Sequence, residues 1–171
     1  MFIAGKNILD GNSHYSEDLD KYFYETHGRR FELKDCATGI KSFSQIQMLL
    51  NNGHLTDKTL LIIDEPEAHL HPQWITEYAK LVVMLHKELG VKFFIASHNP
   101  DMVSAIKNIA EVDGVLDSVN FYLAEKENPT DLQYVYKDCG TDIDPLFESF
   151  NMSYRKLDSY VYAHTDTEVS E

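Results

Sequence analysis

Two acidic side chains stand at the end of the most apolar stretch of the chain. Residues 60–63, Leu-Leu-Ile-Ile, run directly into Asp64 and Glu65, and Pro66 follows. A short apolar run that ends in turn residues is typical of a strand buried on both faces, as in parallel sheets. Open α/β sheets bind their ligands at the carboxyl ends of such strands. Two carboxylates at that position can hold a hard cation, which prefers oxygen ligands, and can orient a water molecule.

A histidine follows a second strand of the same kind. Residues 91–96 form another mostly apolar run, which ends in Ser97 and His98. The intervening residues 72–89 have helical apolar spacing, so the segment reads as a right-handed βαβ unit with parallel strands. Both strand ends then open onto one edge of the sheet. A lone histidine after a strand is usually a packing residue, but its position at the same edge as two carboxylates favours a role in a site.

The run from residue 60 to residue 72 resembles the Walker B motif of ABC-type ATPases. The sequence Leu-Leu-Ile-Ile-Asp-Glu-Pro-Glu-Ala-His-Leu-His-Pro is similar in particular to the branch that includes RecF, the SMC proteins and the overcoming-lysogeny (OLD) family. The resemblance implies that Asp64 holds the Mg²⁺ of Mg-ATP and that Glu65 polarises the attacking water. It also implies that Ser97 and His98 form the H-loop, with His98 contacting the γ-phosphate and the attacking water.

The resemblance extends to the start of a predicted helix at residues 38–50. Residues 37–41, Ala-Thr-Gly-Ile-Lys, stand about 25 residues before Asp64, where ABC ATPases carry their signature motif, usually written Leu-Ser-Gly-Gly-Gln. In that family the motif closes over the γ-phosphate of ATP bound to a second protomer. Thr38 is also a plausible N-cap of the helix. The nucleotide-binding positions that the resemblance implies are Thr38, Gly39, Ile40, Lys41, Ser97 and, at the acidic dimer-contact position of the D-loop, His71.

The phosphate-binding loop of the family has no counterpart in this sequence. Its pattern, Gly-x-x-x-x-Gly-Lys-Ser/Thr, is absent from the 171 residues. The resemblance therefore covers roughly residues 20 to 150 and only the C-terminal half of the ATPase core. In related ATPases the strand before that loop lies beside the H-loop strand, so we expect residues 91–96 to form an unpaired edge. We accordingly expect a fragment, a split subunit or a degenerate remnant, working as a homodimer or with a complementing polypeptide that supplies the phosphate loop.

The fold predicted from these patterns belongs to the α/β class. We expect a mainly parallel sheet flanked by helices, a partial P-loop NTPase core of the ABC ATPase kind, and a small β-hairpin near the N-terminus. The expected divisions are an irregular lead-in at 1–20, an ABC ATPase-like half-domain at 21–162 and a mobile acidic tail at 163–171. The remaining predicted elements are hairpin strands at 22–24 and 31–33, a helix at 101–109, a strand within 115–124, a strand at 132–136, and two terminal helices at 143–150 and 153–162.

Composition limits the partners and the compartment. The formal net charge is −13, from 15 Lys and Arg against 28 Asp and Glu, so nucleic-acid binding by bulk electrostatics is not expected. No apolar run approaches the roughly 20 residues of a membrane span, and the N-terminus lacks the pattern of a secretory signal. Cys36 and Cys139 stand far apart, which suits a reducing cytoplasm. We therefore predict a cytoplasmic protein that binds ATP and Mg²⁺.

Two other functions remain open from the sequence. The chain could be a binding or regulatory module that keeps the fold without turnover, which hydrolysis after mixing with an upstream-encoded partner would distinguish. It could also be a metal-dependent hydrolase, because mixed carboxylate and imidazole ligands suit Mn²⁺ or Zn²⁺. The ligands for that function would come from Asp64, Glu65, Glu67, His69, His71 and His98. Against it, His69 and His71 alternate in an extended loop and would point to opposite sides.

Overall fold

A computed structural model describes residues 9–68, 70–128, 130 and 132–165 of the chain. The chain divides into two compact units, of which the first ends at Val115 and the second begins at Leu116. The half-domain predicted at 21–162 thus draws on both units.

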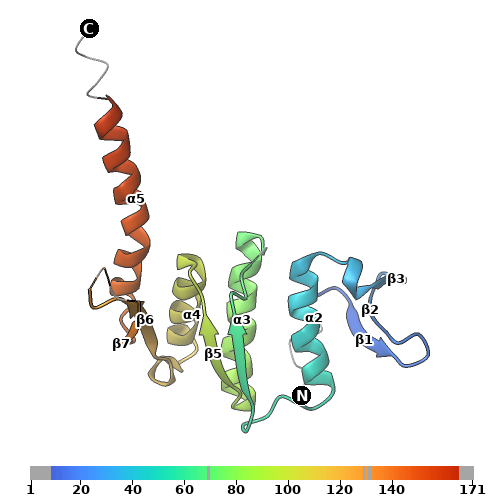
Figure 1. Ribbon diagram of the computed structural model, residues 1–171. Coiled ribbons are helices and arrows are strands. Elements are labelled where there is room, and N and C mark those ends of the chain that lie inside the picture. The colour runs from blue at the N-terminus through green and yellow to red at the C-terminus, as the bar shows by residue number, and fades with distance from the viewer. Residues whose placement is uncertain (1–8, 69, 129, 131, 166–171) are drawn as a thin grey trace. The chain divides into compact units, whose positions relative to one another are not determined.

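The first unit begins with a three-stranded antiparallel sheet (Figure 1). Its strands are β1 (Asn12–Ser16), β2 (Lys21–Thr26) and β3 (Arg29–Glu32), in that spatial order. Two residues join β2 to β3, and both have positive φ, 48° at His27 and 72° at Gly28. This is the geometry of a tight hairpin whose turn matches the twist of its strands. The predicted hairpin is therefore confirmed.

Strand β1 lies in the segment for which the sequence predicts irregular structure, so that part of the prediction is wrong. The strand is mostly polar, and its alternation therefore gives no hydrophobic signal. Ser13 is nonetheless buried, and its hydroxyl donates a hydrogen bond to the Ser44 hydroxyl at 2.7 Å. Its backbone N–H donates to Gln47 Oε1 at 2.7 Å. Tertiary hydrogen bonds, rather than apolar alternation, place this strand in the sheet.

Helix α2 (Thr38–Asn51) follows the sheet after a short 3₁₀ turn, η1 (Leu33–Asp35), and confirms the helix predicted at 38–50. Ala37 rather than Thr38 occupies the N-cap position, and no side chain caps the helix there. The predicted capping role of Thr38 is therefore wrong by one residue, because Thr38 already has helical geometry.

The centre of the first unit is a parallel strand pair that confirms the predicted βαβ unit. Strand β4 (Leu60–Asp64) pairs with β5 (Lys92–Ala96), and helix α3 (Pro72–Leu89) connects them. Gly90 ends α3 in the left-handed conformation, with φ of 71°. Helix α4 (Pro100–Val112) follows β5 and packs against α3.

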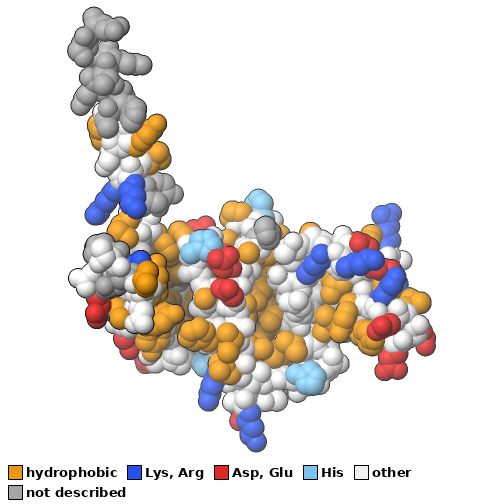
Figure 2. All heavy atoms as spheres, in the orientation of Figure 1, with side chains coloured by type: hydrophobic (Ala, Val, Ile, Leu, Met, Phe, Trp, Pro, Cys, Tyr) orange, Lys and Arg blue, Asp and Glu red, His pale blue; other side chains and the backbone are white. Residues whose placement is uncertain are grey.

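The strand pair buries only one of its faces. Leu61, Phe93 and Ile95 pack against a core that also takes side chains from α2, α3 and α4. On the other face Leu60 is 57% exposed, Ile62 74% and Phe94 57%. The prediction that β4 is buried on both faces is therefore wrong. No described residue covers this second face. Figure 2 shows hydrophobic side chains over this part of the molecule.

The second unit contains a hairpin and a long helix. Strands β6 (Phe121–Glu125) and β7 (Val135–Gly140) pair in antiparallel fashion, after a 3₁₀ turn, η2 (Leu116–Ser118). This confirms the two predicted strands, with β7 beginning three residues later than expected. Helix α5 (Asp144–Thr165) is continuous where two helices are predicted. Nothing at Asn151 or Met152 interrupts a helix, since neither is Gly or Pro.

Two remaining expectations concern the tail and the membrane. Residues 163–165 of the predicted mobile tail belong to α5, and residues 166–171 lie outside the described part of the chain. No helix in the described part combines the length and the apolar composition that a membrane span requires. The chain has the predicted α/β fold class, with parallel pairing in the described residues confined to β4 and β5.

Candidate functional site

The carboxyl end of β4 presents two carboxylates. Asp64 is the last residue of the strand, and Glu65 follows with φ of 46°, in the left-handed region. A side chain in that region costs roughly 1–2 kcal/mol, so the surrounding bonds must hold it. The backbone N–H of Glu65 donates to the carbonyl of Ala96 at 2.8 Å, which extends the contact between β4 and β5 by one residue. The turn is thus anchored to the end of the neighbouring strand.

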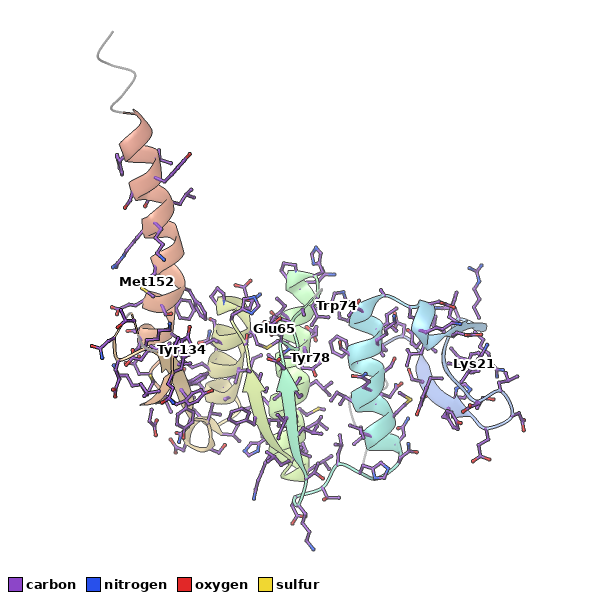
Figure 3. All side chains as sticks on the ribbon, in the orientation of Figure 1. Lys21, Glu65, Trp74, Tyr78, Tyr134 and Met152 are labelled. Carbon is purple, nitrogen blue, oxygen red and sulfur yellow. The ribbon has the colours of Figure 1, made fainter. Side chains whose placement is uncertain are left out.

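This anchoring brings Glu65 to His98, as the sequence predicts. Glu65 Oε1 lies 2.9 Å from His98 Nδ1, and the two side chains are 49% and 75% exposed. Figure 3 shows Glu65 at the end of β4, and Figure 2 shows acidic side chains beside a histidine in the same region. An exposed carboxylate can accept a proton from a water molecule, and an imidazole hydrogen-bonded to it helps to hold it in position. The arrangement is suited to activating water in a solvent-accessible site.

A buried contact lies beside this exposed pair. Ser97 Oγ donates to Glu67 Oε1 at 2.6 Å, and Glu67 is only 5% exposed. The backbone N–H of Asn99 donates to the same Ser97 hydroxyl at 3.1 Å. Glu67 Oε2 has no hydrogen-bond partner among the described residues. The sequence analysis considered Glu67 only as a possible metal ligand and did not predict this contact. The available indication was an acid and a hydroxyl that follow two paired strands.

Asp64 is exposed, and within the described residues its carboxylate has neither a hydrogen bond nor an ion pair. A single free carboxylate fits Mg²⁺, which proteins commonly bind through one or two carboxylates together with substrate phosphates and water. The exposed carboxylate of Asp64 is therefore compatible with the Mg²⁺ that the sequence predicts.

The predicted metal-dependent hydrolase does not gain the same support. In the described residues no group of three or more His, Cys, Asp or Glu side chains is placed to hold a metal ion. His71 is exposed immediately before α3, and its carbonyl accepts from the backbone N–H of Trp74 at 2.7 Å. His69 lies outside the described residues. A Zn²⁺ or Mn²⁺ centre built from several imidazoles is therefore absent from the part of the site that can be seen.

The predicted signature residues lie at the start of α2, against the loop that follows the site. A Cβ on Gly39 would lie 3.0 Å from Leu70 Cδ2, so α2 begins in close contact with that loop. The backbone carbonyl of Thr38 accepts a hydrogen bond from Ser42 Oγ at 3.2 Å. Ile40 packs against the core, and Lys41 is half-buried in the first turn of the helix. The motif is thus attached to the same unit as Glu65 and His98.

Comparison with known families identifies the group to which the chain belongs. A family model described as "AAA domain, putative AbiEii toxin, Type IV TA system" matches residues 10–104, which is more than half of the chain and includes the site. The chain belongs to this AAA-domain family. Its predicted resemblance to ABC-type ATPases of the RecF, SMC and OLD branch is confirmed by its relatives and its structural neighbours.

Two curated relatives of this AAA-domain chain illustrate that branch. An energy-coupling factor transporter ATP-binding protein, EcfA3 of Clostridium perfringens, is 42% identical over 72 residues, covering 42% of this chain and 25% of the relative. The Old nuclease of Escherichia phage P2 is 32% identical over 104 residues, covering 61% of this chain and 17% of the relative. The AAA-domain chain therefore matches a quarter or less of the length of these proteins.

Solved structures show the same fold. One chain, from work on the ATP-driven dimerization and DNA-stimulated activation of SMC ATPases, aligns with a TM-score of 0.57 and 10% identity over 87% of this chain and 85% of that one. The Smc head domain of Pyrococcus yayanosii aligns with a TM-score of 0.59 and 9% identity over 88% of this chain and 27% of that one. Identities this low support the fold alone, which is that of an SMC-type ATPase head.

Proposed function

We propose that this chain supplies the water-activating half of an ATP-hydrolysing site. The observation that carries the proposal is the 2.9 Å contact between Glu65 and His98 at the carboxyl ends of two parallel strands, next to the free carboxylate of Asp64. Its membership of an ATPase family supports ATP as the substrate.

In this proposal each side chain at the strand ends has one role. Mg²⁺ bound with ATP neutralises charge that develops on the phosphate oxygens, and Asp64 is the residue that holds it. Glu65 accepts the proton of the attacking water, and its side chain, immediately after the end of β4, is exposed for that purpose. His98 shares a hydrogen bond with Glu65 and supports the water and the γ-phosphate from the other strand. Ser97 completes the loop that carries His98.

The start of α2 takes a second role. We infer that Thr38, Gly39, Ile40 and Lys41 face the γ-phosphate of ATP held by a second protomer, with His71 as a contact between protomers. The backbone N–H groups at the start of α2 have no side-chain cap, which leaves them available to an anion. One of the solved neighbours comes from work on ATP-driven dimerization, which supports an arrangement with two protomers.

The phosphate-binding loop comes from a segment outside these 171 residues, whether in the same polypeptide or in another. The exposed face formed by Leu60, Ile62 and Phe94 supports this part of the proposal, because a second layer of structure would bury it. We also propose a cytoplasmic location, which the free thiols of Cys36 and Cys139 support.

The first experiment measures Mg-ATP binding and hydrolysis by the chain alone and after mixing with the upstream-encoded polypeptide. Calorimetry of the chain alone should show no tight binding, and hydrolysis should appear on mixing. Glu65→Gln should then lower kcat by about 10²- to 10⁴-fold, the usual contribution of a general base. Glu88→Gln, a change at an exposed glutamate of α3, should leave kcat unchanged.

Two results would contradict the proposal. Hydrolysis that survives Glu65→Gln at the level of the Glu88→Gln control removes Glu65 from the reaction. Micromolar binding of Mg-ATP to the isolated chain shows that the phosphates are held without an additional segment.

A further inference from the structure

The exposed contact between Glu65 and His98 needs support from elsewhere. Both side chains are open to solvent, and exposed pairs of this kind are weakened by screening and by side-chain freedom. The 2.9 Å separation therefore depends on how firmly the two turns that carry these residues are held together. A residue that fixes the turns would control the geometry of the proposed site without touching the substrate.

A buried hydrogen bond joins the two turns. Glu67 follows Glu65 by two residues, and Ser97 immediately precedes His98. The bond from Ser97 Oγ to Glu67 Oε1, at 2.6 Å, therefore links the turn after β4 to the turn after β5. A hydroxyl that donates to a buried carboxylate forms a strong, charge-assisted bond in a low-dielectric environment.

The same hydroxyl also fixes the backbone beyond His98. Ser97 Oγ accepts from the N–H of Asn99, and the Asn99 side chain in turn caps α4 by accepting from the N–H of Asp101 at 2.8 Å. His98 thus stands between two residues whose hydrogen bonds lead back to Glu67 and forward to α4. We propose that Glu67 is a positioning residue that acts through Ser97 to hold His98 beside Glu65. This inference rests on the proposed function, in which Glu65 and His98 activate water.

Only one oxygen of Glu67 is used. Oε1 accepts from Ser97, while Oε2 has no partner in the described part of the chain. The positioning role requires an acceptor at one position and not a second ligating oxygen. Glu67→Gln keeps an acceptor of the same length and should therefore preserve the position of His98, whereas Glu67→Ala removes the acceptor and should not.

The test uses nuclear magnetic resonance of the 171-residue chain with labelled histidine, at one fixed pH. The change in the His98 ring signals on Glu65→Gln reports contact between these two side chains. This change should be lost in Glu67→Ala and in Ser97→Ala, and it should be retained in Glu67→Gln and in Glu88→Ala. The double variant Glu67→Ala/Ser97→Ala should behave like either single variant, because the two residues act as one unit.

Folding is followed separately through the fluorescence of Trp74, the one tryptophan of the sequence, which stacks edge-on against Phe43 in the core of the first unit. If Glu67→Ala fails to fold, Ser97→Ala decides the question, since it removes a smaller group. A full Glu65-dependent change of the His98 signals in a folded Glu67→Ala or Ser97→Ala protein overturns the proposal. A residue with only a structural role would lower stability and leave that change intact.

The ring signals of His98 need no ATP, so this test and the hydrolysis test can fail independently. Loss of the Glu65-dependent change together with hydrolysis that ignores Glu65→Gln would remove the proposed function and keep the positioning role of Glu67. In an active complex, Glu67→Ala should lower kcat with little change in KM, and Glu67→Gln should restore it. A loss confined to KM would contradict the positioning role.

Discussion

Exposed side chains carry the proposed chemistry of this chain, and buried ones hold them in place. Glu65 and His98 are accessible to a water molecule, whereas Glu67 lies inside the protein and contacts the loop of His98 through Ser97. A reactive side chain must be accessible to water and substrate, whereas a hydrogen bond is stronger in the low dielectric of the protein interior. The proposed chemistry and the support for it are thus divided between neighbouring residues of the same two turns.

Tyr78 gives a pH-dependent test of the core of the first unit. Burial raises the pKa of its phenol to about 12, from 10.0. The unfolded chain loses the phenolic proton near pH 10 while the folded chain keeps it to about pH 12, so stability is complete below pH 10 and falls between these values. The loss is on the order of 2–3 kcal/mol.

Denaturant unfolding, followed by Trp74 fluorescence on either side of pH 10, measures this loss. Tyr78→Phe removes the titrating group and should reduce the alkaline destabilisation by the same amount. Equal alkaline losses in the two proteins would contradict the prediction, because the other ionising groups are common to both.

At the scale of elements, buried polar contacts place α2 on the N-terminal sheet. Gln47 accepts from the N–H of Ser13 at 2.7 Å and donates to the carbonyl of Gly11 at 3.2 Å, and only 4% of its surface is exposed. These bonds connect α2 with β1 and its approach. The start of α2 carries the predicted signature residues, so the same contacts bear on their position.

Gln47→Ala should destabilise the first unit by about 1–3 kcal/mol, because it leaves the buried N–H of Ser13 and the part-buried carbonyl of Gly11 without their partner. Gln45→Ala, on the exposed side of the same helix, should change the free energy of unfolding by less than about 0.5 kcal/mol. Urea denaturation of both variants measures the difference. A loss of equal size at both positions would mean that the buried bonds have no special role.

Apolar spacing predicted the elements whose stability depends on apolar burial. Helices α2 and α3, strands β4 and β5, and the turn at Gly90 agree with the sequence because hydrophobic periodicity and turn residues determine them locally. Strand β1 was missed because hydrogen bonds to α2 define it. The bare face of β4 was missed because an apolar run does not reveal which layer is present to cover it.

The site was predictable to the same extent. The βαβ arrangement placed Glu65 and His98 at one edge, and the structure brings them into contact. The bond between Glu67 and Ser97 could not be derived, because spacing along the chain does not tell which side chain of a turn points inward. The roles assigned to the site residues, Glu65, Ser97 and His98 as well as Asp64, His71 and residues 38–41, remain predictions.

For the whole molecule, the exposed face of β4 and β5 is the main departure from a self-contained domain. Ile62 of β4 is paired directly with Phe94 of β5, and both residues are largely exposed. Adjacent apolar side chains on an open sheet favour association with another surface. The isolated chain should therefore self-associate with increasing concentration.

Ile62→Lys should shift the chain towards the monomer in sedimentation velocity, since it places a charge in the middle of that face. Val112→Lys changes an apolar side chain that is 87% exposed on α4 and should leave association unchanged. Identical sedimentation of wild type and Ile62→Lys would show that this face does not mediate self-association.

At Glu65 the proposed reaction requires a carboxylate, whereas the backbone conformation favours glycine. A left-handed residue with a long side chain is less favourable than glycine at the same place, so the protein retains a carboxylate there at a cost in stability. Replacement by glycine would relieve the conformation and delete the acid in one step, mixing two effects of opposite sign. Glutamine keeps the side-chain length and the backbone penalty, and is therefore the substitution that isolates the chemistry of this position.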